Sequence, residues 1–403
     1  MTEEDIVNPL FYLLRQKDDS CLGNPLDQLS SGDWDELMST SLRLGVAPLL
    51  YDRIKRKSFI DQVQVEFMDA LKLAYHNNAA QNLIVRKQLE EILFILETHQ
   101  IPIILLKGSV LAFTIYDNPA CRVMSDLDIL VHETDIPKVL TSFEQIGYQM
   151  SKPAWETPGH HLPALVKPGV CLPVEVHWQL ISPGRAKSIS SEESLASAHS
   201  SMLFGHPFFE LSPTLTLFHN CQHTAYQHRF ANGARGLCDI ESITRFYNEK
   251  INWEMFMSMT EKTSSTRGIL LLLKLSDKLL SVSLPAEIKE RIATENIPDT
   301  MVSAARDRIF IGEEMPDSPP DKFIPVFKWC LIKAQKLLHL FRDTGSQKHE
   351  SSETGKGQSL FWIRRLLYLK KIYWEAAIYL LTSGKESLEA KKNKELRSWL
   401  DIR

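Results

Sequence analysis

Apolar residues recur at helical spacing through the first quarter of the chain. Over residues 34–54 they return every three or four positions, and Gly45 and Pro48 predict a break into two helices. Asp33 is the expected N-cap of the first of these helices. Residues 61–99 continue the pattern without a proline or glycine, which favours one long helix or two abutting helices.

The pattern of apolar residues changes at residue 101 from helical spacing to short apolar runs. Residues 101–106 form a short apolar run, rich in isoleucine, that ends at Lys107-Gly108-Ser109, which predicts a buried strand followed by a turn. Residues 126–131 alternate acidic and apolar side chains and then become wholly apolar, which indicates a second strand. The other expected elements are helices over 110–116 and 134–146 and strands over 148–152, 161–167 and 172–180. This block is therefore a small α/β unit.

Helical spacing returns after about residue 212, with amphipathic runs over 215–226 and 237–247. Residues 343–358 contain no large apolar side chain and predict a flexible linker. Residues 361–381 mix aromatic and basic side chains, which suits either a helix on a membrane surface or a terminal helix packed on the protein body. The expected domains are a helical region (1–100), an α/β core (101–210), a helical domain (211–342), the linker (343–358) and a helical tail (359–403).

The composition narrows the classes of protein and partner. The 403 residues carry a formal net charge of -4, so no global positive field draws the protein to nucleic acid, which we do not expect as a partner. The six cysteines are widely spaced and form no CxxC pair, which favours a reducing compartment over a zinc knuckle or a disulfide framework. The first residues lack the features of a signal peptide, and no run of 18 apolar residues occurs. We therefore expect a cytoplasmic protein without a transmembrane segment.

Three parts of the central block carry candidate chemistry. Gly108 and Ser109 follow a strand, where a glycine lets backbone N–H groups approach a phosphate and a serine adds a hydroxyl donor. Asp126 and Asp128 are two residues apart, so on one strand they would point to the same face, where a divalent cation would relieve their mutual repulsion. Glu175, flanked by valines on a predicted strand, could complete a metal site.

The segment from residue 107 to 131 resembles the polymerase-β-type nucleotidyltransferase superfamily, whose signature is a strand, a Gly-Ser or Gly-Gly turn, and an Asp-x-Asp strand. More narrowly, about residues 85–250 resemble the bacterial family called uncharacterised nucleotidyltransferase. The matching motifs are Leu106-Lys107-Gly108, Tyr116, Pro119, Arg122 and Asp126-Leu127-Asp128. The resemblance implies an α+β fold, with a small mixed-sheet nucleotidyltransferase core flanked by N-terminal and C-terminal helical regions. Members are associated with bacterial biosynthetic clusters.

The resemblance also implies a mechanism. Asp126, Asp128 and Glu175 would hold two Mg²⁺ (or Mn²⁺) ions for in-line transfer of a nucleoside monophosphate, with AMP from ATP as the first expectation. The acceptor would be a hydroxyl of a small molecule, sugar or peptide, and pyrophosphate would leave. The nucleotide-binding residues would be Lys107, Gly108, Ser109 and Arg122. Glu175 could also act as the base. On this interpretation Asp126→Asn or Asp128→Asn abolishes turnover and leaves the fold intact.

Several residues keep two interpretations. Arg122 could bind phosphate or pair with an acid. His177 lies two residues after Glu175 and could contact metal or substrate, or only pack. His219, His223 and Asp239 could line the cleft or make hydrogen bonds between helices.

Two departures from the superfamily pattern bear on these assignments. Sixteen residues separate Ser109 from Asp126, which is longer than usual, and 46 residues separate Asp128 from Glu175, which makes Glu175 the least firm metal ligand. The alternative functions are an Asp-x-Asp glycosyltransferase that uses a nucleotide sugar, and a non-catalytic nucleotide-binding or interaction module.

Overall fold

The structure is a computed structural model that describes residues 3–15, 25–57, 59–152, 160–169, 172–181, 189–311 and 388–401. The chain divides into two compact units, residues 1–313 with 396–403, and residues 314–395. The fold described below is that of the first unit. The predicted linker over 343–358 and the aromatic and basic segment over 361–381 lie outside the described residues.

The N-terminal part is helical, as predicted. Its helices are α1 (Glu3–Leu14), α2 (Ser31–Arg43), α3 (Ala47–Arg56) and α4 (Val65–Thr98), with a 3₁₀ turn, η1 (Ile60–Gln62), before α4. The predicted break is confirmed: Gly45 has a positive φ of 70°, and a proline stands in the first turn of α3. The prediction of Asp33 as N-cap was wrong, because Ser30 caps α2 and Asp33 accepts the Ser30 backbone N–H at 2.8 Å from the third helical position.

The central block forms a mixed sheet of seven strands in the order β3-β4-β5-β2-β1-β7-β6. The strands are β1 (Ile104–Leu106), β2 (Leu127–Leu130), β3 (Gln149–Met150), β4 (Leu165–Val166), β5 (Val174–His177), β6 (His199–Leu203) and β7 (His206–Glu210). Strand β2 runs antiparallel to β1 and parallel to β5, while β7 lies parallel to β1 on its other side. The β6–β7 hairpin was not predicted, because β6 is largely polar and exposed, and β7 contains a proline and no clear alternation of apolar and polar residues.

Short helices connect the strands. They are α5 (Gly108–Thr114), the 3₁₀ turns η2 (Pro119–Cys121) and η3 (Glu133–Asp135), α6 (Ile136–Gln145) and α7 (Ser191–Ser197). The predicted helices over 110–116 and 134–146 correspond to α5 and α6. Strands β1 and β2 are completely buried, so the motif residues at their ends belong to a rigid part of the core. The fold is therefore α+β, as expected, with a mixed sheet that is preceded and followed along the chain by helical regions.

The C-terminal part is again helical. Its elements are α8 (Pro213–Gln222), a π-helical turn η5 (His223–Gln227), α9 (Ala234–Tyr247), a 3₁₀ turn η6 (Asn248–Lys250), α10 (Trp253–Lys262), α11 (Thr266–Leu280), α12 (Ala286–Thr294), α13 (Asp299–Ile311) and α16 (Leu388–Asp401). Among the described residues, no helix has the length and apolarity needed to cross a bilayer.

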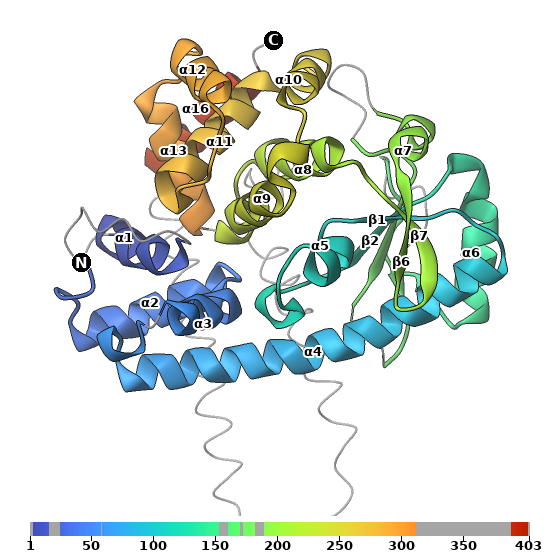
Figure 1. Cartoon of the computed structure of the whole chain (residues 1–403), viewed down its shortest axis with the longest axis horizontal. Helices are drawn as coiled ribbons and strands as arrows, with labels where there is room; N and C mark the ends of the chain where they lie inside the picture. Colours follow the sequence, from blue (N-terminus) through green and yellow to red (C-terminus); the bar gives the residue numbers. More distant parts are fainter. Residues whose placement is uncertain are drawn as a thin grey trace, which may run out of the picture. The chain divides into compact units, whose positions relative to one another are not determined.

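Helix α4 links the N-terminal helices to the sheet. Figure 1 shows it running from below α2 and α3 to the sheet and α6. Three of its polar side chains are buried and bind loop backbone rather than water. Asn78 donates to the Ala120 carbonyl at 2.7 Å, Asn82 donates to the carbonyls of Pro119 and Arg122 at 2.6 and 2.9 Å, and Gln88 donates to the Leu172 carbonyl at 2.6 Å. These bonds fix the turn before β2 and the approach to β5, from which the candidate site residues project.

Replacing Asn82 by leucine should destabilise the protein by about 2–3 kcal/mol, because it leaves buried carbonyl groups without a donor. The matched control is Asn77→Leu, which changes an exposed asparagine on the same helix. Urea unfolding of the two variants measures the difference. Equal midpoints for Asn82→Leu and Asn77→Leu would show that the two bonds do not hold the turn.

Candidate active site

The turn after β1 is tightly constrained. Lys107 has φ 47° and ψ −129°, a left-handed conformation that is costly for a side-chain-bearing residue and is typical of functional turns. Gly108 begins α5, and a Cβ at this position would lie 2.8 Å from a guanidinium nitrogen of Arg122. A side chain at this position would therefore have to displace the Arg122 guanidinium.

Ser109 is completely buried. Its hydroxyl accepts the backbone N–H of Asp128 at 2.8 Å, so it ties the start of α5 to β2. The sequence suggested that this hydroxyl would contact a phosphate, but in the structure it is used inside the protein.

Asp128, Glu175 and His177 lie together on neighbouring strands. Asp128 is in register with Glu175 across the parallel β2–β5 pair, and His177 follows two residues later on the same face. The His177 Nε2 atom is 2.9 Å from Asp128 Oδ1 and 3.7 Å from Glu175 Oε2. One ligand atom from each of these residues lies within 4.8 Å of the other two, a spacing that suits a metal ion.

Asp126 is not part of this three-residue group. Strand β2 begins at Leu127, so Asp126 lies immediately before its first residue, close enough to Asp128 for the Asp128 charge to act on it. Asp126 instead lines a polar pocket described below.

The Asp128 carboxylate is the most deeply buried charge of the group, with 1% of the residue exposed. The Lys107 ammonium donates to its Oδ1 atom at 2.7 Å. Burial alone would raise the pKa of Asp128, but the Lys107 charge and the His177 hydrogen bond outweigh it and hold the pKa well below its usual range. The Oδ2 atom is buried and has no hydrogen-bond partner among the residues that the structure describes.

The other two carboxylates are in the opposite situation. Burial, and then the nearby Asp128 charge, raise the pKa of both Asp126 and Glu175. A cation beside the carboxylates would relieve this repulsion, and the unpartnered Asp128 Oδ2 offers it an oxygen ligand. The residues present therefore fit a divalent metal ion.

Arg122 forms an ion pair, which was one of its two interpretations. Its guanidinium donates to both oxygens of Asp239, with Nε–Oδ1 at 3.1 Å and NH2–Oδ2 at 2.7 Å, and to the Val123 carbonyl at 2.8 Å. The Tyr116 hydroxyl donates to Asp239 Oδ1 at 2.8 Å. The long segment between Ser109 and Asp126 thus contains two of the motif residues, Tyr116 and Arg122, and both bind the Asp239 carboxylate of α9.

A polar pocket lies between the Lys107 turn and the segment from α8 to α9. Its empty volume is about 540 Å³, part of it open to solvent. Six residues singled out in the sequence line it, namely Lys107, Gly108, Arg122, Asp126, His223 and Asp239. The sequence analysis missed the others, which are Ser125, Asn220, Thr224, His228, Asn232 and Arg235. His223 begins a π-helical turn. Such turns are rare in proteins, and those that occur are often found at functional sites, so this turn also points to a functional role.

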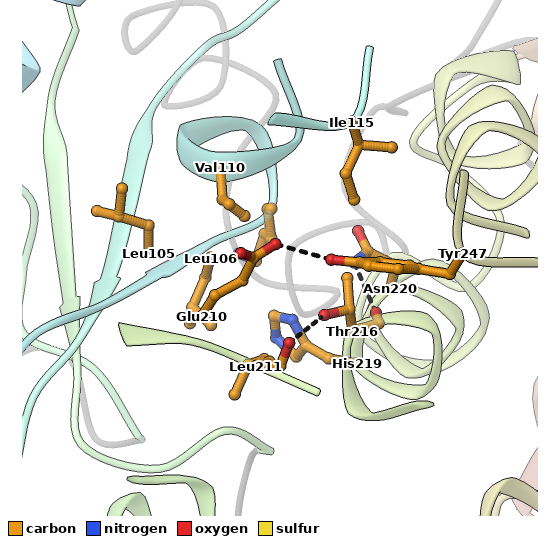
Figure 2. Close-up of a pocket in the computed structure, with 11 residues that line it drawn as sticks. Leu105, Leu106, Val110, Ile115, Glu210, Leu211, Thr216, His219, Asn220 and Tyr247 are labelled. Atoms are coloured by element: carbon orange, nitrogen blue, oxygen red, sulfur yellow. Dashed lines mark hydrogen bonds between the residues drawn. The ribbon is translucent and has the colours of Figure 1, made fainter. Parts of the chain in front are cut away.

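A second, narrower hollow shares Lys107 and Asn220 with the polar pocket. Figure 2 shows it between the β1–α5 turn and helices α8 and α9, with His219 and Asn220 on α8 and Tyr247 reaching Glu210. The Tyr247 hydroxyl donates to Glu210 at 2.7 Å, and apolar residues such as Val110 and Ile115 line the rest. His219 is buried in this hollow.

Buried histidines surround the Lys107–Asp128 pair. Burial lowers the pKa of His177 to about 4, although the hydrogen bond to Asp128 and the Asp128 charge act in the opposite direction. Burial first, and then nearby positive charge, lowers the pKa of His219 and His160 to about 3. The same two effects hold the pKa of His223 well below its usual value. Gln227 links His160 to His223, with its Nε2 atom 3.0 Å from His160 Nε2. These imidazoles are therefore neutral at pH 7 and can act as metal ligands or hydrogen-bond partners.

Asp128→Asn should destabilise the protein by about 3 kcal/mol, because it leaves the Lys107 ammonium buried without its counter-ion. The structure therefore revises the expectation that this variant keeps the wild-type fold unchanged. Adding Lys107→Met should restore most of the loss, since a neutral pair needs no compensation. Urea unfolding of the two single variants and the double variant measures the coupling. Strictly additive effects would contradict the assignment of a buried ion pair.

The free energy of unfolding should fall as the pH drops from about 6.5 to about 4. Histidines of the unfolded chain have a pKa near 6.5, so over this range they bind protons that the buried histidines of the folded protein do not bind. Each such histidine lowers the free energy of unfolding by up to about 1.4 kcal/mol per pH unit. His219→Gln should remove one histidine's share of this slope, and the exposed His76→Gln should not. Urea unfolding at several pH values provides the test. Parallel pH curves for wild type and His219→Gln would contradict it.

Comparison with known proteins agrees with the motifs. The model of the family described as "Uncharacterised nucleotidyltransferase" matches residues 30–281, which is more than half of the chain. No curated protein matches. The solution structure of the antibiotic-resistance factor ANT(2'')-Ia matches with a TM-score of 0.34 and 9% identity, over 45% of this chain and 94% of that chain. On the family match, the chain belongs to the uncharacterised nucleotidyltransferase family.

Proposed function

We propose that this protein transfers a nucleoside monophosphate, with AMP from ATP as the first candidate, to a hydroxyl group of an acceptor and releases pyrophosphate. The observation that carries the proposal is the Asp128 carboxylate, which is buried, has one oxygen without a partner among the described residues, lies beside Glu175 and binds Lys107, a lining residue of the polar pocket. Membership of the nucleotidyltransferase family supports the same reaction class.

Asp128 and Glu175 would hold a divalent ion, Mg²⁺ or Mn²⁺, and Asp126 would join them once substrate is bound. Such an ion lowers the pKa of an acceptor hydroxyl and neutralises charge on the phosphates. Asp126 lies on the pocket side of the group, close enough for the Asp128 charge to raise its pKa. This position suits a carboxylate that helps to hold a cation against the nucleotide.

The polar pocket would take the phosphate chain. Lys107 and Arg235 bring positive charge to it, and Arg122 adds a guanidinium whose direction is fixed by Asp239. Gly108 keeps this side of the pocket narrow, because its lack of a Cβ lets Arg122 approach the turn. Lys107 would then contact both the Asp128 carboxylate and a phosphate. Strained backbone of the kind seen at Lys107 is typical of residues with such a role.

The transfer itself forms one bond and breaks another. The acceptor oxygen attacks the α-phosphorus, the bond from that phosphorus to the α–β bridging oxygen breaks, and pyrophosphate leaves. The acceptor's proton passes to Glu175, whose pKa is raised by burial and by Asp128 and so lies nearer to neutral than that of an ordinary glutamate. Asn220, His223 and His228, which also line the pocket, would contact the nucleoside or the acceptor.

Calorimetric titration with ATP, CTP, GTP and UTP, in the presence of Mg²⁺ or Mn²⁺, tests the proposal. One triphosphate should bind in a metal-dependent manner, and Asp126→Asn should weaken this binding by at least about tenfold, the scale of losing a group that supports a metal site. Asp126 is the preferred target because it leaves the buried Lys107–Asp128 pair intact. Glu133→Gln, at an exposed acid of the same domain, is the matched control and should bind like wild type.

Two outcomes would replace the proposal. Binding of a nucleotide sugar without binding of any triphosphate would favour the glycosyltransferase alternative. Metal-independent nucleotide binding that is the same in wild type and Asp126→Asn would indicate a non-catalytic nucleotide-binding module.

A further inference from the structure

The cluster of Asp128 and Glu175 also contains a histidine nitrogen, that of His177. The metal ligands that the family resemblance implies are carboxylate oxygens alone. We propose that His177 is a ligand of the metal ion, and that it makes the site favour a first-row transition ion, Mn²⁺, over Mg²⁺. This inference rests on the proposed function, because it concerns the ion that would serve the same reaction.

The distances around His177 suit a shared ion. Its Nε2 atom is 2.9 Å from Asp128 Oδ1 and 3.7 Å from Glu175 Oε2. Adjacent ligands of an octahedral ion with bonds of about 2.1 Å lie about 3 Å apart, and the ligand atoms of the three side chains lie within 4.8 Å of one another. An ion would replace the hydrogen bond from Nε2 to Asp128 Oδ1, and His177 would then be the neutral tautomer that carries its proton on Nδ1.

The two carboxylate oxygens of Asp128 have different surroundings. Oδ1 already accepts from Lys107 at 2.7 Å, whereas Oδ2 is buried and has no partner. A buried carboxylate oxygen without a donor is costly, and a metal ion would satisfy it. Oδ2, a Glu175 oxygen and His177 Nε2 would then form one face of the coordination shell and leave the remaining positions to water and substrate.

The strand pairing holds His177 in place. Its carbonyl accepts the Val131 N–H at 3.0 Å, and the rings of His160 and His161 lie 5.3 and 5.1 Å from its ring. The residue is 3% exposed, so the ring has little freedom to turn away. A ligand fixed in this way is positioned before the ion arrives.

The donor set selects the ion. Mg²⁺ prefers oxygen ligands and parts with its water reluctantly, whereas imidazole suits first-row transition ions. Two carboxylates and one imidazole therefore favour Mn²⁺ more strongly than three carboxylates would. The gain should be visible as a larger ratio of Mn²⁺ to Mg²⁺ affinity.

Pulsed electron paramagnetic resonance of the full-length protein with MnCl₂ alone provides a direct test, since a coordinated imidazole nitrogen gives a ¹⁴N coupling to bound Mn²⁺. The coupling should be present in wild type and absent in His177→Gln. His161→Gln is the matched control, because it removes the neighbouring imidazole, and it should keep the coupling. Titration of each protein with MnCl₂ and MgCl₂ should show that His177→Gln loses Mn²⁺ affinity by about tenfold or more, with a smaller loss for Mg²⁺.

Glutamine also separates a ligand from a positioning residue. It can still donate a hydrogen bond to Asp128, so a residue that only orients the carboxylate would be rescued, with wild-type Mn²⁺ affinity. Circular dichroism and thermal unfolding confirm that the variant is folded, and His177→Asn provides a second replacement. Mn²⁺ that binds wild type through Asp128 without a ¹⁴N coupling, or that binds His177→Gln unchanged, overturns this inference alone. Failure of wild type to bind Mn²⁺ or Mg²⁺, with or without a triphosphate, overturns the proposed function as well.

Discussion

The burial of one carboxylate, that of Asp128, shapes the rest of the site. A charge removed from water must be compensated, and here Lys107 and His177 contact Oδ1 of the carboxylate at 2.7 and 2.9 Å, while Ser109 holds the Asp128 backbone by accepting its N–H at 2.8 Å. Among the described residues Oδ2 has no hydrogen-bond partner, and on the proposed function a metal ion would bind there. The Asp128 charge adds to the burial that raises the pKa of Glu175, whereas the nearby histidines are neutral because they are themselves buried.

The surrounding fold supplies rigidity at a distance from this carboxylate. The buried amides of α4 hold the loops before β2 and β5, and the Asp239 carboxylate of α9 fixes Arg122 against Gly108. Helices from both flanking parts therefore contact Arg122, and both helices lie within the range of the family match, residues 30–281.

The sequence predicted the elements that depend on local patterns. The apolar runs of β1, β2 and β5, the long α4 and the break at Gly45 follow from periodicity and from glycine and proline. It could not predict contacts that depend on register or on distant pairing. Asp128 meets His177 only because β2 and β5 align across 49 residues of chain, and Arg122 meets Asp239 across 117. Asp126 was placed on the strand because the strand's start cannot be read to within one residue.

The most direct measurement is a crystal structure of the protein with MnCl₂ and a non-hydrolysable ATP analogue, with anomalous scattering used to locate manganese. The account predicts an anomalous peak within about 2.3 Å of Asp128 Oδ2 and of a Glu175 oxygen, with the phosphates in the pocket lined by Lys107 and Arg235. A manganese or nucleotide position remote from Asp128, in crystals that contain both, would contradict it.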